Sequence, residues 1–215
     1  YVDDTVVFSP SMLDALNKKQ FTDWEDIMID NASIQKYDLS VRTGTENTKF
    51  SSSLGYYKHD GMVPTSGYER FTYRMNVDQK IYKTVTMGAN LLYTKADRSQ
   101  ENENFYKMVT MDPLSRAYDD DGKMLSLTGD QVYSPLFDIY NSYNKVNTNR
   151  MLLNVYLDWE IVKGLPYRLN TSINNRDYER NQYLNSEHSV GKNSKGEATI
   201  ENRKNEEYLI ENILT

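Results

Sequence analysis

The residues of this chain with the most chemistry to offer are arginines and asparagines that recur at every second position of several segments. In 71–77 and 167–175 they alternate, together with Thr72 and Ser172, with Phe71, Tyr73, Met75 and Val77 and with Tyr167, Leu169, Thr171 and Ile173. Guanidinium and amide groups can hydrogen-bond sugar hydroxyls, peptide groups or another part of a protein, but burying them unpaired in a dry core is costly. Such a face must therefore be wet, either lining a hydrated lumen or forming the solvent-exposed side of an ordinary sheet. The lumen interpretation is favoured. It places on the polar face Arg42, Lys49, Arg74, Asn76, Asn90, Asn154, Arg168, Asn170, Asn174 and Arg176, and we assign seven of these to the lumen: Arg74, Asn76, Asn90, Asn154, Arg168, Asn170 and Asn174.

Two features could suggest a metal site. Three consecutive aspartates and a glycine at 119–122 suggest a calcium loop, because hard cations bind clustered oxygen ligands. The EF-hand pattern would need an aspartate at position 117, where Ala117 stands, so a solvated turn is the better interpretation. The two histidines, His59 and His188, are expected in polar loops without a neighbouring ligand triplet. We therefore predict no metal site.

Signatures of catalysis are missing from the sequence. It contains no nucleophile elbow, phosphate-binding loop, zinc-protease helix or dinucleotide fingerprint. It has no cysteine and hence no thiolate nucleophile or disulfide framework. Its net charge of -6 argues against nucleic-acid binding. We predict that the chain is not an enzyme and uses no cofactor.

The polar side chains are positioned by segments that alternate with period two, which is typical of β-strands. Phe71, Tyr73, Met75 and Val77 occupy the odd positions of one segment, and 85–93 continues the pattern. Successive side chains of a strand point to opposite faces, so each segment has one apolar and one polar face. A transmembrane β-barrel needs this arrangement, with lipid outside and water inside. The 18 tyrosines fit the aromatic girdles of such a barrel as well as general strand propensity.

The lengths of the connections between these strands are informative. The predicted connections are short turns near 44–47, 78–83 and 161–166, and long polar loops at 58–67, 96–147 and 179–204. Because turns and loops alternate, all the long loops fall at one end of the sheet, as in outer-membrane barrels with short periplasmic turns and long extracellular loops. We predict an extracellular loop and strand lead-in at 1–33, and a partial β-barrel at 34–215. The fold class is all-β, an antiparallel meander of about seven strands.

The ends of the chain suggest that it is part of something larger. Residue Tyr1 is not followed by a charged and then apolar leader, and a last strand candidate from about 205 runs to Thr215. About seven strands are too few for a large barrel and would leave two unpaired edges. We expect an internal piece of a longer protein rather than a cytosolic one.

Several motifs follow one another along the chain: TDW at 22–24, IQKYDLSV at 34–41, GTENTKF at 44–50, LGYYKHDG at 54–61, YERFTYRMNVD at 68–78, MDPL at 111–114 with DG at 121–122, and NRMLLNVYLDWEIVKGL at 149–165. In the same order, these segments resemble those of one family, the SusC/RagA-type TonB-dependent outer-membrane transporters of Bacteroidetes. Arg42 departs from the small residue that the family has before the first turn, which changes the polarity of the face.

The resemblance implies a fold, a location and partners. It implies a slice of a large 22-stranded transmembrane β-barrel that encloses a plug, in the outer membrane of a Gram-negative, Bacteroidetes-like cell. It further implies a SusD-like lipoprotein partner, energy from the TonB complex through parts outside this chain, and uptake of oligosaccharides or oligopeptides. Loop aromatics are candidates for contact with the ligand or with the SusD-like lid: Tyr106, Tyr118, Tyr133, Tyr140 and Tyr143. The alternative is a soluble, secreted β-rich module whose tyrosines stack on glycans.

Overall fold

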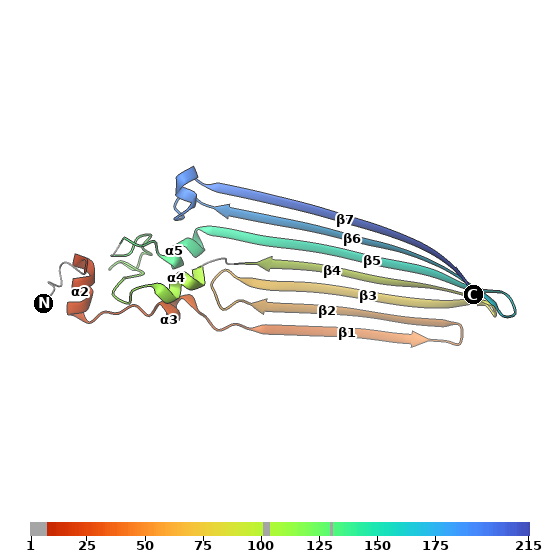
Figure 1. Ribbon diagram of the computed structural model, residues 1–215. Coiled ribbons are helices and arrows are strands. Elements are labelled where there is room, and N and C mark those ends of the chain that lie inside the picture. Colours follow the sequence, from red (N-terminus) through yellow and green to blue (C-terminus); the bar gives the residue numbers. More distant parts are fainter. Residues whose placement is uncertain (1–7, 101–103, 130) are drawn as a thin grey trace.

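Seven antiparallel strands form one sheet, with a small helical region at one end of it (Figure 1). The computed structural model describes residues 8–100, 104–129 and 131–215. The strands are β1 (Ile34–Gly44), β2 (Thr48–Asp60), β3 (Gly67–Tyr82), β4 (Val85–Ser99), β5 (Ser142–Val162), β6 (Leu165–Leu184) and β7 (Glu197–Leu214). Each strand pairs with the next one along the chain, which confirms the prediction of an all-β antiparallel meander.

The register of the strands separates the sheet into two chemically different faces. Across β3 to β7, Met75, Leu91, Leu153, Ile173 and Tyr208 lie opposite one another in turn and form an unbroken apolar row. Their sequence neighbours point the other way because side chains alternate along each strand. We call the side of this row the apolar face and the opposite side the polar face.

The apolar face is a band rather than a whole surface. On β4 and β5 it covers 85–93 and 151–159, which matches the ~9–11 residues that a tilted strand needs to cross the hydrocarbon core of a membrane. Aromatic side chains lie at both edges of the band. Trp159 pairs with Tyr167 near the tight turns, and Tyr73 pairs with Tyr93 near the loops.

The connections differ sharply between the two ends of the sheet. Tight turns at 45–47, 83–84 and 163–164 lie at one end, and the loops 61–66, 100–141 and 185–196 lie at the other (Figure 1). In the last of the turns Gly164 has φ of +84°, a left-handed conformation that glycine adopts without a steric penalty.

The predicted loop bounds are wrong because the strands run well past the apolar band. The segments predicted as loops at 58–67, 96–147 and 179–204 shorten to 61–66, 100–141 and 185–196, and the turns predicted at 78–83 and 161–166 shorten to two residues each. Beyond the band both faces are polar, as at Asp97, Asn147 and Glu179, which pair across β4, β5 and β6. Backbone pairing continues there although the alternation that signals a strand has disappeared. His59 consequently lies in β2 and not in a loop.

Among the described residues, the loop end carries four short helices, which we call the helical cap: α2 (Pro10–Lys18), α3 (Trp24–Met28), α4 (Asn104–Thr110) and α5 (Pro135–Tyr140). Three of them begin at a side-chain N-cap, in which Ser9, Asp23 or Ser134 accepts a hydrogen bond from a backbone N–H of the first turn. Proline occupies the first position of α2 and α5, where its missing N–H has no helical partner to lose. The 3₁₀ turn η1 (Gly191–Ser194) lies in the loop before β7.

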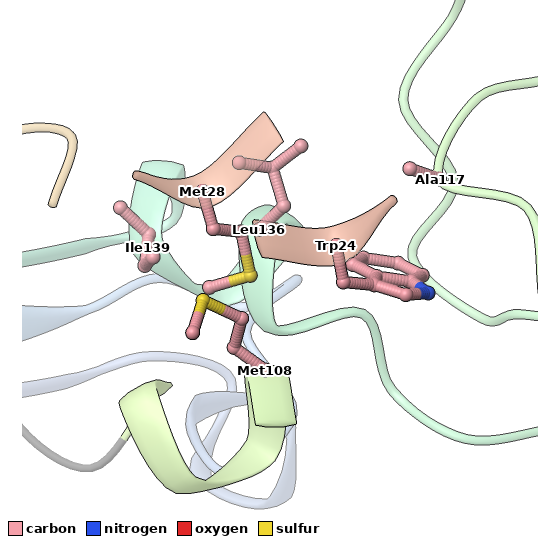
Figure 2. Close-up of a cluster of buried hydrophobic side chains, with 6 residues drawn as sticks. All are labelled: Trp24, Met28, Met108, Ala117, Leu136 and Ile139. Atoms are coloured by element: carbon pink, nitrogen blue, oxygen red, sulfur yellow. The ribbon is translucent and has the colours of Figure 1, made fainter. Parts of the chain in front are cut away.

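The buried core of the molecule lies in this cap and not in the sheet. Figure 2 shows Met28 and Met108 meeting between α3 and α4, with Leu136 and Ile139 of α5 beside them. Trp24 is buried in the same cluster, and its indole N–H donates to the carbonyl of residue 112 at 3.2 Å. The segment 1–33, predicted as an extracellular loop and strand lead-in, thus contributes α2, α3 and part of this core. Within the ranges that the structure describes, no helix has the length and apolar character required to cross a membrane.

Candidate functional site

An amide ladder crosses the polar face of four strands. The side-chain amide of Asn90 donates to Asn154 at 3.3 Å, Asn154 donates to Asn170 at 2.6 Å, and Asn170 donates to the carboxylate of Glu211 at 2.9 Å. An asparagine amide has both donors and an acceptor, so each one passes a hydrogen bond to the next. The result is a fixed polar row perpendicular to the strands of β4 to β7.

A second, parallel row lies closer to the loop end of the sheet. The guanidinium of Arg150 donates to Asn174 at 3.2 Å, and Asn174 donates to the carboxylate of Glu207 at 2.8 Å. On the same face, toward the β1 edge of the sheet, Asn76 of β3 donates to the hydroxyl of Ser51 on β2 at 3.1 Å. The polar face is therefore an organised hydrogen-bonding surface.

The turn end of the polar face holds a more compact cluster. Arg168 binds Asp158 with two hydrogen bonds of 2.5 and 2.7 Å and lies 5.4 Å from the ring centroid of Tyr156. Tyr156 crosses over Gly88, the residue opposite it on β4, and donates its hydroxyl to Asp78 at 2.5 Å. A Cβ at position 88 would come within 2.3 Å of the Tyr156 ring. Glycine is required there because the ring occupies the space that a side chain would need.

The structure brings the seven polar residues predicted for the lumen onto this one face. Strand pairing places Asn76, Asn90 and Asn154 level with one another, and the others follow at alternate positions. Arg74 lies apart from the ladder, over β2 and near β1. The sequence reasoning missed the acceptors Glu207 and Glu211 of β7. Extending the period-two count into 201–211 would have found them.

The five loop tyrosines do not gather into one site. Tyr106 on α4 and Tyr140 at the end of α5 are largely exposed, while Tyr118 forms an isolated bridge with Met124. Tyr133 contacts the ammonium of Lys192, which lies 3.9 Å from its ring centroid. Tyr143 belongs to β5, where the strand continues past its predicted start. It was expected in the loop because polar residues surround it.

A buried carboxylate joins two of the loops. Asp138 of α5 is fully buried and accepts from the backbone N–H of Ser189 at 2.8 Å, the hydroxyl of Ser189 at 2.5 Å and the ammonium of Lys107 at 3.2 Å. His188 was predicted in a polar loop, and it does lie in 185–196, but it is buried with Nε2 3.9 Å from Asp138. Its Nδ1 accepts the N–H of Val190 at 3.0 Å. Burial lowers the pKa of His188, an effect that Asp138 opposes and Lys107 reinforces. This cluster fastens the loop before β7 to the helical cap.

The aspartate run at 119–122 forms a turn. The carboxylate of Asp119 accepts the backbone N–H groups of Asp121 and Lys123 at 3.0 and 2.8 Å, and Arg116 pairs with Asp120 at 2.6 Å. The guanidinium of Arg116 holds the pKa of Asp120 below its usual value. Among the described residues, no group of three or more histidines and carboxylates is arranged to hold a metal ion.

Comparisons with known proteins agree on one kind of receptor. No protein-family model matches the chain. TonB-dependent receptor P3 of Formosa agariphila is 27% identical over 206 residues, which is 90% of this chain and 21% of the receptor. TonB-dependent receptor SusC of Bacteroides thetaiotaomicron is 24% identical over 201 residues, 81% of this chain and 20% of the receptor. The chain thus spans about a fifth of the length of these curated relatives.

A solved structure shares the fold. The RagAB peptide importer in its "closed-closed" state superposes with a TM-score of 0.63 at 18% identity, over 76% of this chain and 20% of that one. This likeness is one of fold: the open, two-faced antiparallel sheet is consistent with a slice of a large β-barrel. Together with the sequence relatives, the sheet and this likeness support the SusC/RagA type of TonB-dependent transporter, the family predicted from the motifs, with this chain matching a barrel segment.

Proposed function

We propose that the chain forms part of the wall of an outer-membrane nutrient importer, with its apolar face against lipid and its polar face lining the lumen. The observation that carries this proposal is the register, which keeps apolar residues opposite apolar residues from β3 to β7. In a soluble protein a sheet face of this extent would need a covering layer. The described helices pack at the loop end and leave the apolar face of the sheet uncovered (Figure 1).

The loop lengths support an orientation. The tight turns 45–47, 83–84 and 163–164 would face the periplasm, and the helical cap with the loops 61–66, 100–141 and 185–196 would face outward. Strands that continue past the apolar band on the loop side would carry the cap above the membrane surface.

The cargo and partners follow from the relatives as proposals. The RagAB structure is described as a peptide importer, and the amide ladder would suit peptide groups and sugar hydroxyls alike. We propose uptake of oligopeptides or oligosaccharides with a SusD-like lipoprotein, driven by the TonB complex through parts of the receptor outside this chain. The tyrosines predicted for the loops remain candidates for contact with the ligand or the lipoprotein: Tyr106, Tyr118, Tyr133 and Tyr140, together with Tyr143 at the start of β5.

Paired cysteines test the two-faced assignment, because the chain has no cysteine of its own. Asn90→Cys and Leu91→Cys are neighbours on β4 that point to opposite faces. They would be made in the full receptor, with any other cysteine replaced, and treated with a small hydrophilic maleimide after insertion into membranes. We expect Asn90→Cys to react and Leu91→Cys to resist until the protein is unfolded. A soluble binding module predicts that the two labelling rates are similar and that the expressed protein is a monomer without detergent. That result would refute the barrel assignment.

A further inference from the structure

Four cationic side chains surround two adjoining hollows on the polar face of β1, β2 and β3. One hollow, of about 230 Å³, is lined by Lys36, Arg70 and Arg74. The other, of about 190 Å³, is lined by Arg42 and Arg74. Arg74 and Ser53 line both, so the hollows adjoin. In a chain with a net charge of -6, this is a locally cationic surface.

The charge of the two arginines nearest the second hollow is uncompensated. Asp38 is the carboxylate that lines the first hollow, and Lys36 already binds it at 3.1 Å. Within residues 8–100, 104–129 and 131–215, no carboxylate forms an ion pair with Arg42 or Arg74. By contrast Arg168, elsewhere on the same face, is held by two hydrogen bonds to a carboxylate. Two guanidinium groups beside one hollow repel each other unless an anion lies between them.

The floor of the hollow offers further donors. It is made of the small hydroxyl residues Ser40, Ser51 and Ser53, which leave room between the arginine side chains. Asn76 donates to the oxygen of Ser51 at 3.1 Å, so the hydroxyl proton of Ser51 can point into the hollow. Guanidinium groups at the sides and hydroxyl groups below are the donors that bind carboxylate, sulfate or phosphate oxygens most strongly.

We propose that this hollow is an oxyanion subsite, which binds an anionic group of the cargo, a carboxylate or a sulfate-type ester, as it passes the wall. The subsite rests on the proposed function, since it needs the polar face to line the lumen. It deepens that function by giving the receptor a preference for acidic over neutral cargo at this position. Arg42 and Arg74 bind the anion, and Arg70 raises the local concentration of anions.

Residue-resolved arginine labelling tests the subsite in the full receptor. The purified receptor in detergent micelles would be treated with phenylglyoxal at constant ionic strength, with chloride replaced stepwise by sulfate or by acetate, and labelled peptides quantified by mass spectrometry. We expect added oxyanion to slow the labelling of Arg42 and Arg74 in a saturable way, and to leave Arg168 unaffected. Whichever of sulfate and acetate protects at the lower concentration identifies the preferred anionic group.

Variants separate specific binding from general charge. With Arg42→Ser, the oxyanion concentration that half-protects Arg74 should rise about tenfold, because a charge-assisted hydrogen bond is lost. Arg42→Lys should recover part of the affinity, since it restores the charge without the planar fork. Arg176→Ser, which removes a positive charge from the same face of β6, should leave protection unchanged. An equal loss with Arg176→Ser would overturn the subsite in favour of diffuse screening.

Two other results would also overturn the subsite while leaving the barrel assignment in place. One is labelling of Arg42 and Arg74 that neither oxyanion slows. The other is complete resistance of both arginines to label before any oxyanion is added, which would mean that another part of the receptor fills the hollow. Equal maleimide reactivity of Asn90→Cys and Leu91→Cys would instead refute the proposed function itself. The two failures are therefore distinguishable.

Discussion

The contact between Gly88 and Tyr156 gives a prediction whose size can be worked out from the structure. A methyl group at position 88 would lie 2.3 Å from the tyrosine ring, so Gly88→Ala must move the ring. The displaced ring gives up its 2.5 Å hydrogen bond to Asp78 and its position beside the guanidinium of Arg168. Forcing a methyl group into a packed site costs about 1–3 kcal/mol. The lost hydrogen bond adds about 1 kcal/mol, since water can replace the tyrosine on the carboxylate.

We therefore expect Gly88→Ala to lower the free energy of unfolding of the receptor by about 2–4 kcal/mol. Tyr156→Phe removes only the hydroxyl and should cost about 1 kcal/mol. The assay is urea unfolding of the receptor in lipid vesicles, followed by the loss of heat-modifiable electrophoretic mobility. Tyr156→Ser makes space above position 88 and is the matched background for the glycine substitution.

In that background Gly88→Ala should be close to neutral, because the clashing ring is gone. The difference between the two backgrounds is a coupling free energy between the residues. If Gly88→Ala costs the same in both, the cost comes from the backbone of β4 and the packing argument is refuted.

Two further predictions concern the apolar face and the cap. Leu91→Arg should destabilise the assembled barrel by about 2–4 kcal/mol, the cost of placing arginine at the bilayer midplane, and so impair its assembly in membranes. Asn90→Arg, on the other face, should assemble normally. Wild-type heat-modifiable mobility for Leu91→Arg would contradict a lipid-facing role. Because burial lowers the pKa of His188, the released loop takes up a proton more readily than the docked loop. The docking of 185–196 onto the cap is then fully stable above about pH 6.5 and weakens as the pH falls below it. Once each observed rate is divided by the intrinsic exchange rate at that pH, the protection of this loop against amide hydrogen exchange should fall as the pH is lowered from about 7.5 to about 5.5. It should stay constant in His188→Asn, which keeps an acceptor for the N–H of Val190. Protection that rises at acid pH would mean that Asp138 outweighs burial.

The fold could be predicted wherever one face of a strand is apolar. In 85–93 and 167–175 the alternation signals both the strand and its orientation, and the structure confirms the meander. The extensions of β5 and β6 toward the loops could not be predicted. Asn147 and Glu179 are polar there, although the same face is apolar closer to the turns. What holds those extensions together is backbone pairing, which leaves no mark in the composition.

The polar face was predictable as a set but not as a network. The sequence predicts that Asn90, Asn154 and Asn170 lie on one face, because each occupies a polar position in the period-two alternation of its strand. Which amide meets which depends on the register, and the register depends on turn lengths that the sequence placed only to within a few residues. The crossing of Tyr156 over Gly88 could not be predicted. A single glycine in a strand indicates that another group approaches closely, but it does not indicate which residue that is.

The two edges of the sheet connect the structure to the proposed function. β1 and β7 each pair on one side only, so each leaves a row of backbone N–H and C=O groups without a partner among the described strands. In water these groups would be solvated, but in the hydrocarbon core of a membrane every unsatisfied group costs several kcal/mol. The apolar band reaches both edge strands: it includes Leu39 and Val41 on β1, and Tyr208 and Ile210 on β7. A sheet cannot place these residues against lipid and leave its edges open, so the lipid-facing assignment requires further strands beside both β1 and β7.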